Sequence, residues 1–210
     1  EHLVKKIFPE IRALCRHRGV AFTDIDLRWG ITEEEAEREG IIRICLEEID
    51  RCRPYFIGIL GERYGWTPPR SDAERVADDY PILADAMLHG ASITEMEIVH
   101  GVLANPAMAG HAFFYFRDRN ATPAEFIDTD PDADNRLNAL KERIRRSGFP
   151  VREDFSSPAE LGAWLEEDLR HVVNTEHPES ETPSELELER SKLKRLKNAR
   201  SATLDGEAVA

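Results

Sequence analysis

Two carboxylates lie close together in the segment from Ser92 to Ile98, which follows a long polar stretch. Serine commonly caps helix N-termini, so this spacing places Glu95 and Glu97 in the first turns of a helix. One interpretation is structural: Glu95 completes a capping box with Ser92, and the helix dipole favours Glu97 as a surface charge. The other is that an acid at this helix start serves a bound substrate. The spacing leaves both interpretations open.

Three candidate binding loops follow segments that we predict as strands. They are Arg28-Trp29-Gly30, Gly61-Glu62-Arg63-Tyr64-Gly65-Trp66 and Arg117-Asp118-Arg119. We expect them to open on one edge of a sheet. The first two combine arginine, aromatic rings and glycine, which supply a charged fork, a stacking face and close backbone approach for a nucleotide. The alternative is that the aromatic rings only seal the sheet edge.

The elements that would position these residues alternate along the chain. Apolar spacing, capping residues and glycines predict helices over 3–15, 32–52, 92–103, 134–147 and 158–173, and strands over 20–27, 54–61, 111–116 and 149–154. Residues 61–90 are predicted to be mainly polar, and 118–131 to be a loop. This alternation indicates an α/β fold with a doubly wound parallel sheet, in which ligands lie beyond the carboxyl ends of the strands.

The C-terminal part of the sequence is different in character. Residues 177–183 are polar and contain proline, and 185–200 form a charged helical pattern with few apolar positions. We therefore predict one domain over 1–176, and a polar linker with a charged helix over 177–210.

Composition excludes several classes of protein. The formal charge of −13 opposes binding of nucleic acid, which proteins hold with massed lysine and arginine. No apolar run is long enough to span a membrane and no signal peptide is evident, so we expect a cytoplasmic protein without membrane contact. There is no P-loop and no nucleophile turn. Three cysteines without a CxxC, and His89, His100 and His111 without ligand spacing, predict no metal.

Long motifs in the chain resemble a known family. Residues 24–32, 44–66 and 92–98 closely resemble a TIR-like domain found at the amino terminus of NACHT-type STAND ATPases, including relatives of telomerase-associated protein 1 and nephrocystin-3. The resemblance covers residues 1 to about 175. It implies a flavodoxin-like fold, which agrees with the alternation of helices and strands.

The resemblance also implies an activity. Related enzymes place a glutamate on the helix beside the ligand cleft, and Thr94-Glu95-Met96-Glu97 matches that pattern, with Glu97 as the catalytic acid and Glu95 as the less favoured choice. The implied reaction is hydrolysis of NAD+ to nicotinamide and ADP-ribose on oligomerisation, as in innate immune or anti-phage defence, with no cofactor required. The acid would stabilise the oxocarbenium-like state. The implied substrate-binding residues are Arg28, Trp29, Arg63, Tyr64, Trp66, Ser92 and Thr94.

Two other functions stay open. The first is a non-catalytic TIR-like module that self-associates or recruits a partner, and in either case self-association is expected through an attached NACHT/STAND ATPase. A salt bridge at Glu97 without a cleft beside Arg28 or Arg63 would favour this module, whereas a cleft containing all three would favour the enzyme. The second is a base-exchange or deoxyribosyl transferase that acts on free nucleosides.

The ends of the sequence depart from the family pattern. The family normally opens with a strand, whereas this sequence begins at Glu1-His2-Leu3, inside the following helix. We therefore expect the first, central strand to be missing from the chain. Near the other end, 186–190 resemble the family's linker to the ATPase, whereas 201–210 do not continue that resemblance.

Overall fold

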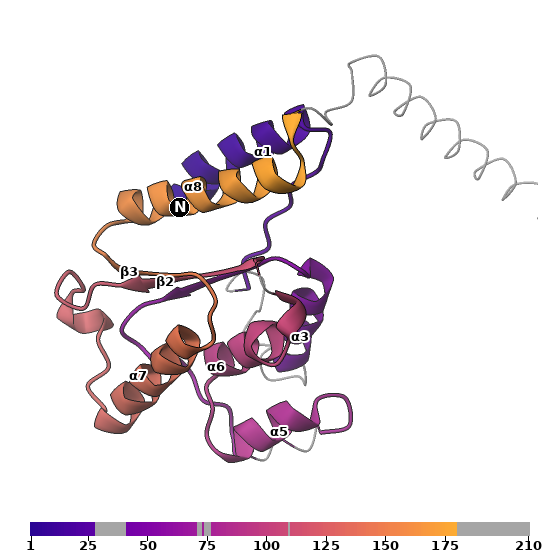
Figure 1. Ribbon diagram of the computed structural model, residues 1–210. Helices are drawn as coiled ribbons and strands as arrows, with labels where there is room; N and C mark the ends of the chain where they lie inside the picture. The colour runs from indigo at the N-terminus through magenta and orange to yellow at the C-terminus, as the bar shows by residue number, and fades with distance from the viewer. Residues whose placement is uncertain (28–40, 71–72, 74–76, 109, 180–210) are drawn as a thin grey trace, which may run out of the picture. The chain divides into compact units, whose positions relative to one another are not determined.

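The computed structural model describes residues 1–27, 41–70, 73, 77–108 and 110–179 (Figure 1). The chain divides into two compact units, one made of Glu1–Asp24 and Gly162–Ala210 and the other of Ile25–Leu161. The larger unit combines a parallel sheet with helices. The α/β class predicted from the sequence is thereby confirmed.

A parallel sheet of three strands organises the larger unit. Its order is β1 (Phe56–Leu60), β2 (Ala112–Arg117) and β3 (Val151–Phe155). β1 and β2 pair in unbroken register from Phe56 opposite Ala112 to Leu60 opposite Phe116, whereas the β2–β3 register shifts between Tyr115 and Arg117. The predicted strands at 54–61, 111–116 and 149–154 are confirmed, with ends moved by one or two residues.

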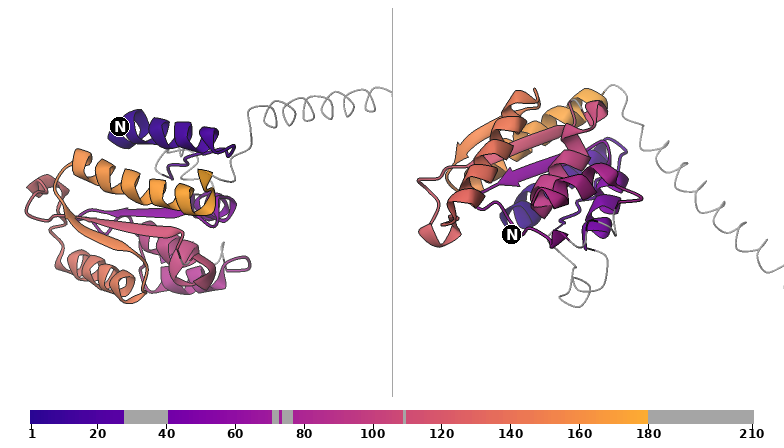
Figure 2. Two further views of the ribbon diagram at one scale, coloured as in Figure 1. Left: turned by 45° about the horizontal axis from the view of Figure 1, so that its top comes forward. Right: turned by 90° about the horizontal axis from the view of Figure 1, so that it is seen from below.

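Helices of the larger unit lie between and beside these strands in sequence. They are α3 (Ile41–Cys52), α5 (Pro81–Leu88), α6 (Ile93–Ile98) with the π-helical turn η3 (Val99–Leu103), the 3-10 turns η4 (Pro106–Met108) and η5 (Ala124–Phe126), and α7 (Pro131–Arg146). Figures 1 and 2 show α3, α6 and α7 on the same side of the sheet. Consecutive parallel strands in the order β1-β2-β3 place their crossovers on one face when both crossovers have the same hand.

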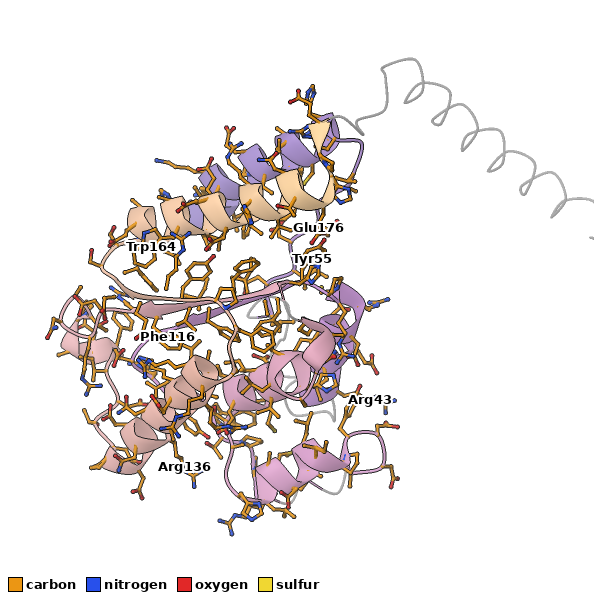
Figure 3. All side chains as sticks on the ribbon, viewed as in Figure 1. Arg43, Tyr55, Phe116, Arg136, Trp164 and Glu176 are labelled. Carbon is orange, nitrogen blue, oxygen red and sulfur yellow. The ribbon has the colours of Figure 1, made fainter. Side chains whose placement is uncertain are left out.

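The main core of this unit fills the space between the sheet and its helices. Phe56, Leu60, Phe114 and Phe116 pack from β1 and β2 against apolar residues of α6, η3 and α7. Figure 3 shows side chains filling this layer, with Phe116 labelled. A second cluster joins α3, α5 and α6 through residues such as Leu46, Met87 and Met96. The two clusters fix α6 between the sheet and α5, and α6 carries the predicted acids.

One helix lies where the sequence predicted mainly polar loop. α5 occupies Pro81–Leu88 within the 61–90 region, so the prediction for this region is wrong there. Pro81 stands at the first turn, where a missing N–H costs nothing, and Leu83, Ala84 and Met87 form the buried side. The helix is too short for its period to be evident beside the charged residues around it. Arg136 of α7, labelled in Figure 3, donates to the carbonyls of His89 and Gly90 at 3.0 and 2.9 Å, just after the helix ends.

The smaller unit contains the two ends of the described chain. A π-helical turn, η1 (Leu3–Ile7), leads into α1 (Phe8–His17), and α8 (Pro158–Glu176) lies beside α1 in Figures 1 and 2. Pro9 has no N–H to donate to the preceding turn, and Phe8 N–H bonds to Leu3 O instead of the α-helical partner. The predicted helices over 3–15 and 158–173 are confirmed.

The segment predicted as a strand over 20–27 is extended but forms no strand. A strand requires a ladder partner, and none of the described strands pairs with it. Instead, Phe22 packs on Phe8, with ring centroids 5.7 Å apart, and Asp24 accepts a hydrogen bond from Arg12. Two residues of extended chain span about 6–7 Å, and four residues of a helix span about the same length. Every second side chain of the extended segment can therefore contact side chains spaced four apart on one face of α1.

Several predictions fall on residues outside the described ranges. These are Arg28 and Trp29, the first part of the helix predicted over 32–52, and the chain after 179 with its predicted charged helix. Among the described residues, no helix is both long enough and apolar enough to cross a membrane.

Gly58 provides a test of the sheet packing. A Cβ atom at this position would lie 2.5 Å from Cδ1 of the buried Phe114 ring, so we expect Gly58→Ala to lower the free energy of unfolding by about 1–3 kcal/mol. Urea denaturation followed by circular dichroism measures the change. Gly61→Ala is the matched control because nothing lies within 4 Å of its Cβ position. Equal stability of the two variants would contradict this account of the core.

Candidate functional site

A hydroxyl group holds the start of the helix that carries the predicted acids. Ser92 caps α6 by accepting a hydrogen bond from the Glu95 N–H at 3.2 Å. In an ordinary capping box the Glu95 side chain would return to the Ser92 N–H. Here the Ser92 N–H donates to the Tyr64 hydroxyl at 3.2 Å, and that hydroxyl donates to Oε2 of Glu95. The predicted capping box is therefore present, but its second hydrogen bond, between the Ser92 N–H and the Glu95 carboxylate, is made through the Tyr64 hydroxyl.

Both carboxylate oxygens of Glu95 are engaged. Oε2 receives the Tyr64 hydroxyl, and Oε1 receives Nη1 of Arg143 from α7 at 2.5 Å. Burial and the hydrogen bond to Glu95 raise the pKa of Tyr64, so the hydroxyl remains a donor at neutral pH. Glu95 therefore links α6 to the exit loop of β1 and to α7.

Glu97 has a different environment. It is half-buried on α6 and takes part in no ion pair within the described part of the chain. Burial raises its pKa, and its neighbour is the Cys45 thiol of α3. Burial and the carboxylate together raise the pKa of Cys45 to about 12, so this thiol stays protonated and can donate to Glu97. Glu97 is therefore a carboxylate held in a partly desolvated position, and no cation of the described residues pairs with it.

The first residues after β1, Glu62 to Trp66, lie against the start of α6. Glu62 forms a parallel bridge with Ile127, and the Tyr64 N–H donates to Asp128 at 2.7 Å. The carbonyl of Trp66 then accepts from the Ile93 N–H at 3.0 Å. Gly65 has φ of 96°, and a Cβ there would lie 3.2 Å from the hydroxyl of Thr94. This contact places Thr94 directly beneath the loop.

The predicted binding residues on this loop point in different directions. Tyr64 is buried, whereas the Trp66 side chain is 57% exposed. Arg63 donates to the carbonyl of Glu125, and its guanidinium lies 5.5 Å from the centre of the Phe126 ring. It makes no hydrogen bond or ion pair with Glu97.

The structure thus brings together part of the predicted set. Tyr64, Ser92, Thr94 and Glu95 meet at the start of α6, Glu97 lies on the side of α6 toward α3, and Arg63 lies toward η5. Ser92 is fully buried, so its hydroxyl serves the helix cap. Arg28 and Trp29 lie outside the described residues.

A charged cavity of about 380 Å³ lies at the ends of β2 and β3. Its walls contain none of the predicted catalytic or substrate-binding residues, but they do contain Glu62, Arg117 and Arg119 of the predicted binding loops. The lining residues are Glu62, Phe116, Arg117, Arg119, Asp134, Asn138, Lys141, Arg145, Glu153 and Asp154. The sequence did signal part of it, because Arg117-Asp118-Arg119 follows a predicted strand and Lys141 adjoins the apolar residues Leu140 and Ile144 of a helix. In the part of the chain that the structure describes, no group of three or more histidine, cysteine, aspartate or glutamate side chains could hold a metal ion.

Comparison with known proteins identifies relatives but no described activity. Residues 9–170 match the family described as "Domain of unknown function (DUF4062)". A TPR repeat-containing protein of Dictyostelium discoideum is 30% identical over 196 residues, which cover 85% of this chain and 12% of that protein. Telomerase protein component 1 of Rattus norvegicus is 34% identical over 156 residues, 68% of this chain and 6% of that protein.

A human protein matches over a longer part of the chain. NACHT domain- and WD repeat-containing protein 1 of Homo sapiens is 27% identical over 203 residues, which cover 92% of this chain and 11% of that protein. The chain therefore spans a small part of each of these much longer relatives. No solved structure matches the chain.

The Tyr64 hydroxyl is open to a direct test. We expect Tyr64→Phe to lower the free energy of unfolding by about 1–3 kcal/mol, because it leaves the buried Ser92 N–H and one Glu95 oxygen without a partner. Tyr80→Phe is the control, since the Tyr80 hydroxyl has no hydrogen bond to the described residues and its ring packs on His100. Thermal unfolding of both variants gives the comparison, and a Tyr64 variant as stable as wild type would remove the proposed link.

The raised pKa of Glu97 predicts a stability change with a definite sign. When the pKa of a carboxyl group is higher in the folded state, the folded protein holds the proton more tightly than the unfolded chain does. The free energy of unfolding therefore falls as pH rises through the folded-state pKa of Glu97. We expect Glu97→Gln to be more stable than wild type at pH 7. The difference should disappear as pH falls below the ordinary glutamate pKa of about 4.3.

Glu160 provides the control of opposite sign. The backbone N–H and hydroxyl of Ser156 each donate to Glu160 at 2.8 Å, and these bonds lower its pKa. Glu160→Gln should therefore destabilise the protein at pH 7, with the loss shrinking in acid. Melting temperatures across pH 3–8 test both; a destabilised Glu97→Gln protein at pH 7 would contradict the environment described for Glu97.

Proposed function

The chain belongs to the family described as "Domain of unknown function (DUF4062)", and from this premise we propose that it is a TIR-like effector domain that hydrolyses NAD+. The reaction breaks the bond between C1′ of the ribose and the nicotinamide nitrogen. The bonding electrons leave with nicotinamide, water adds to C1′ and loses a proton, and the products are nicotinamide and ADP-ribose. The proposal further assigns the domain a flavodoxin-like fold.

The state of Glu97 is the observation that supports this reaction best. Breaking the glycosidic bond develops positive charge on the ribose, and a carboxylate beside it lowers the energy of that state. Glu97 is half-buried and free of ion pairs within the described residues, so its charge is not already neutralised by a cation. Partial burial strengthens the interaction of an ionised carboxylate with a developing cation. These are properties that the proposed acid requires.

Glu95 is a poor candidate for the same role. Its two oxygens are occupied by Tyr64 and Arg143, and its N–H is used in the cap of α6. In the proposed enzyme Glu95 is therefore a positioning residue that sets the direction of α6. Trp66, which is exposed on the adjoining loop, offers a face on which the substrate base can stack.

The relatives support the proposed setting of the domain. The names of these relatives refer to NACHT, WD and TPR regions, and the chain spans only a small part of each protein. We assign the proposed activity to the oligomer, with self-association through an attached NACHT/STAND ATPase bringing the domains together. No cofactor enters the proposed reaction, and NAD+ is its substrate.

Nicotinamide release tests the proposal. The chain is fused to a tetrameric coiled coil, incubated with NAD+, and the products are separated by chromatography. We expect release from wild type and a fall of about 100-fold or more in Glu97→Gln, because the charge-stabilising carboxylate is lost. Glu10→Gln, which changes an exposed acid of α1, should leave the rate unchanged.

The stability measurements keep the result interpretable. Glu97→Gln is expected to be folded and more stable at pH 7, so its loss of activity would not reflect unfolding. No release from the clustered wild-type protein, or equal release from wild type and Glu97→Gln, would overturn the proposed hydrolysis. The non-catalytic self-association module would then be the better account.

A further inference from the structure

The charged cavity of the larger unit is built where parallel sheets hold ligands, yet the proposed hydrolysis does not use it. Phe116 and Arg117 end β2, and Glu153 and Asp154 lie near the end of β3. The opposite wall is a single stripe of α7. Its members are Asp134, Asn138, Lys141 and Arg145. Their spacing of four, three and four residues places all of them on one helix face.

The local backbone of β3 increases the number of polar side chains in this cavity. Successive residues of a regular strand point to opposite faces of the sheet. Asp154 has φ of 66°, and the β2–β3 register is irregular beside it. This break in the alternation lets Glu153 and Asp154, although consecutive, both line the cavity.

A buried ion pair lies on one side of the cavity. Glu62, whose side chain is 4% exposed, accepts from Lys141 at 2.6 Å and from Arg119 at 2.9 Å. Arg119 also donates to Asp134 at 2.7 Å. The charges of Glu62 and Asp134 are therefore satisfied by cations from α7 and from the loop after β2.

The other side is arranged in the same way. Nε and Nη2 of Arg145 donate to the two oxygens of Glu153 at 2.9 and 2.6 Å. The Lys141 ammonium and the Arg145 guanidinium lie 5.6 and 5.2 Å from the centre of the Phe116 ring. The ring and the carboxylates hold both cations in fixed positions.

Arg117 is the exception among the four cations. Its one hydrogen bond within the described chain runs from Nη2 to the carbonyl of Ala121, at 3.4 Å. Its Nε is buried and has no hydrogen-bond partner. Buried donors without acceptors are uncommon because each costs about 1–3 kcal/mol. Because this Nε has almost no accessible surface, a ligand in the cavity can reach the guanidinium only through its outer Nη groups.

We infer that this cavity binds a small metabolite through an anionic group, either phosphate or carboxylate, with Arg117 as the principal contact. Three guanidinium groups and one ammonium match the four carboxylates of Glu62, Asp134, Glu153 and Asp154 in charge, but they carry more N–H donors than these carboxylates accept. The remaining donors suit the oxygens of an anion, and guanidinium forks match phosphate and carboxylate geometry.

Size and charge both limit the ligand. A cavity of about 380 Å³ is at the lower end of the range for small-molecule sites, which is about 300–1,000 Å³. The chain carries a formal charge of −13, which opposes a polyanion such as nucleic acid. A small ligand with one or two anionic groups can instead be held by a local arrangement of arginines.

Calorimetric titration of the whole chain tests this inference, with inorganic pyrophosphate as the phosphate probe and succinate as the carboxylate probe. Saturable binding of either probe supports the site, and the ratio of the two affinities tells which anion it prefers. Pyrophosphate and succinate do not report on the hydrolysis of NAD+, so failure here is distinguishable from failure of the proposed hydrolysis. No saturable binding of either probe overturns the inference.

Variants locate the binding. Arg117→Gln should weaken binding of the preferred probe by about tenfold or more, because a charged hydrogen bond is lost. Arg117→Lys keeps the charge and loses the fork, so it should bind more weakly than wild type and more tightly than the glutamine variant. Arg117 forms no ion pair in the described chain, so both variants are expected to fold, which circular dichroism verifies.

A neighbouring arginine provides the matched control. Arg146 adjoins the cavity residue Arg145 on α7 but does not line the cavity, and it pairs with Glu142 at 2.8 Å. Arg146→Gln should bind the probe with wild-type affinity. Equal weakening by Arg146→Gln and Arg117→Gln would indicate diffuse surface attraction, and wild-type affinity in Arg117→Gln would remove its assigned contact; either result overturns the inference.

Discussion

Parallel pairing of β1 with β2 is the constraint on which the position of the described candidate residues after these strands depends. Because both strands run in the same direction, their exit loops meet at one edge, and the 2.9 Å pair between Glu62 and Arg119 joins those two loops directly. The pairing in turn requires glycine at position 58, where a side chain would meet the Phe114 ring. The parallel pairing of β1 with β2 therefore positions the loops that contact the start of α6 and the charged stripe of α7.

Glu95 and Glu97 show how two acids two residues apart acquire different roles. The 3.6-residue period turns them to different sides of α6. Glu95 is neutralised by Arg143 and held by a hydrogen bond from Tyr64, whereas Glu97 meets the Cys45 thiol, which is neutral and donates only weakly. The first arrangement stabilises the fold. The second leaves a partly desolvated charge, which is unfavourable for folding and is the condition under which a carboxylate acts strongly on a cationic transition state.

Local sequence signals predicted the parts of the fold that depend on local physics. The apolar runs at 56–60 and 112–116 form strands, as continuous apolar segments between turn residues predict, and Ser92 caps α6 as its residue type suggests. The predicted strand over 20–27 is wrong because alternating polarity indicates which side chains are buried but cannot supply a neighbouring strand. Phe22 and Asp24 contact α1 instead. The Tyr64 hydroxyl in the cap and the pairing of Glu62 with Lys141 join residues 28 and 79 positions apart, which no local pattern encodes.

The cavity shows that the net charge of an acidic chain does not describe the charge at each site within it. Net charge describes the field far from the molecule, whereas the buried Glu62 and Lys141 respond to partners within a few ångströms. Desolvation makes an isolated buried charge unfavourable, so the buried Glu62 is paired with Lys141 and Arg119, while Asp134 and Glu153 pair with Arg119 and Arg145. This pairing fixes the cations in place and leaves part of their donor capacity unused. An acidic protein can therefore hold an ordered group of arginines, provided that neighbouring carboxylates neutralise most of their charge without using all of their N–H groups.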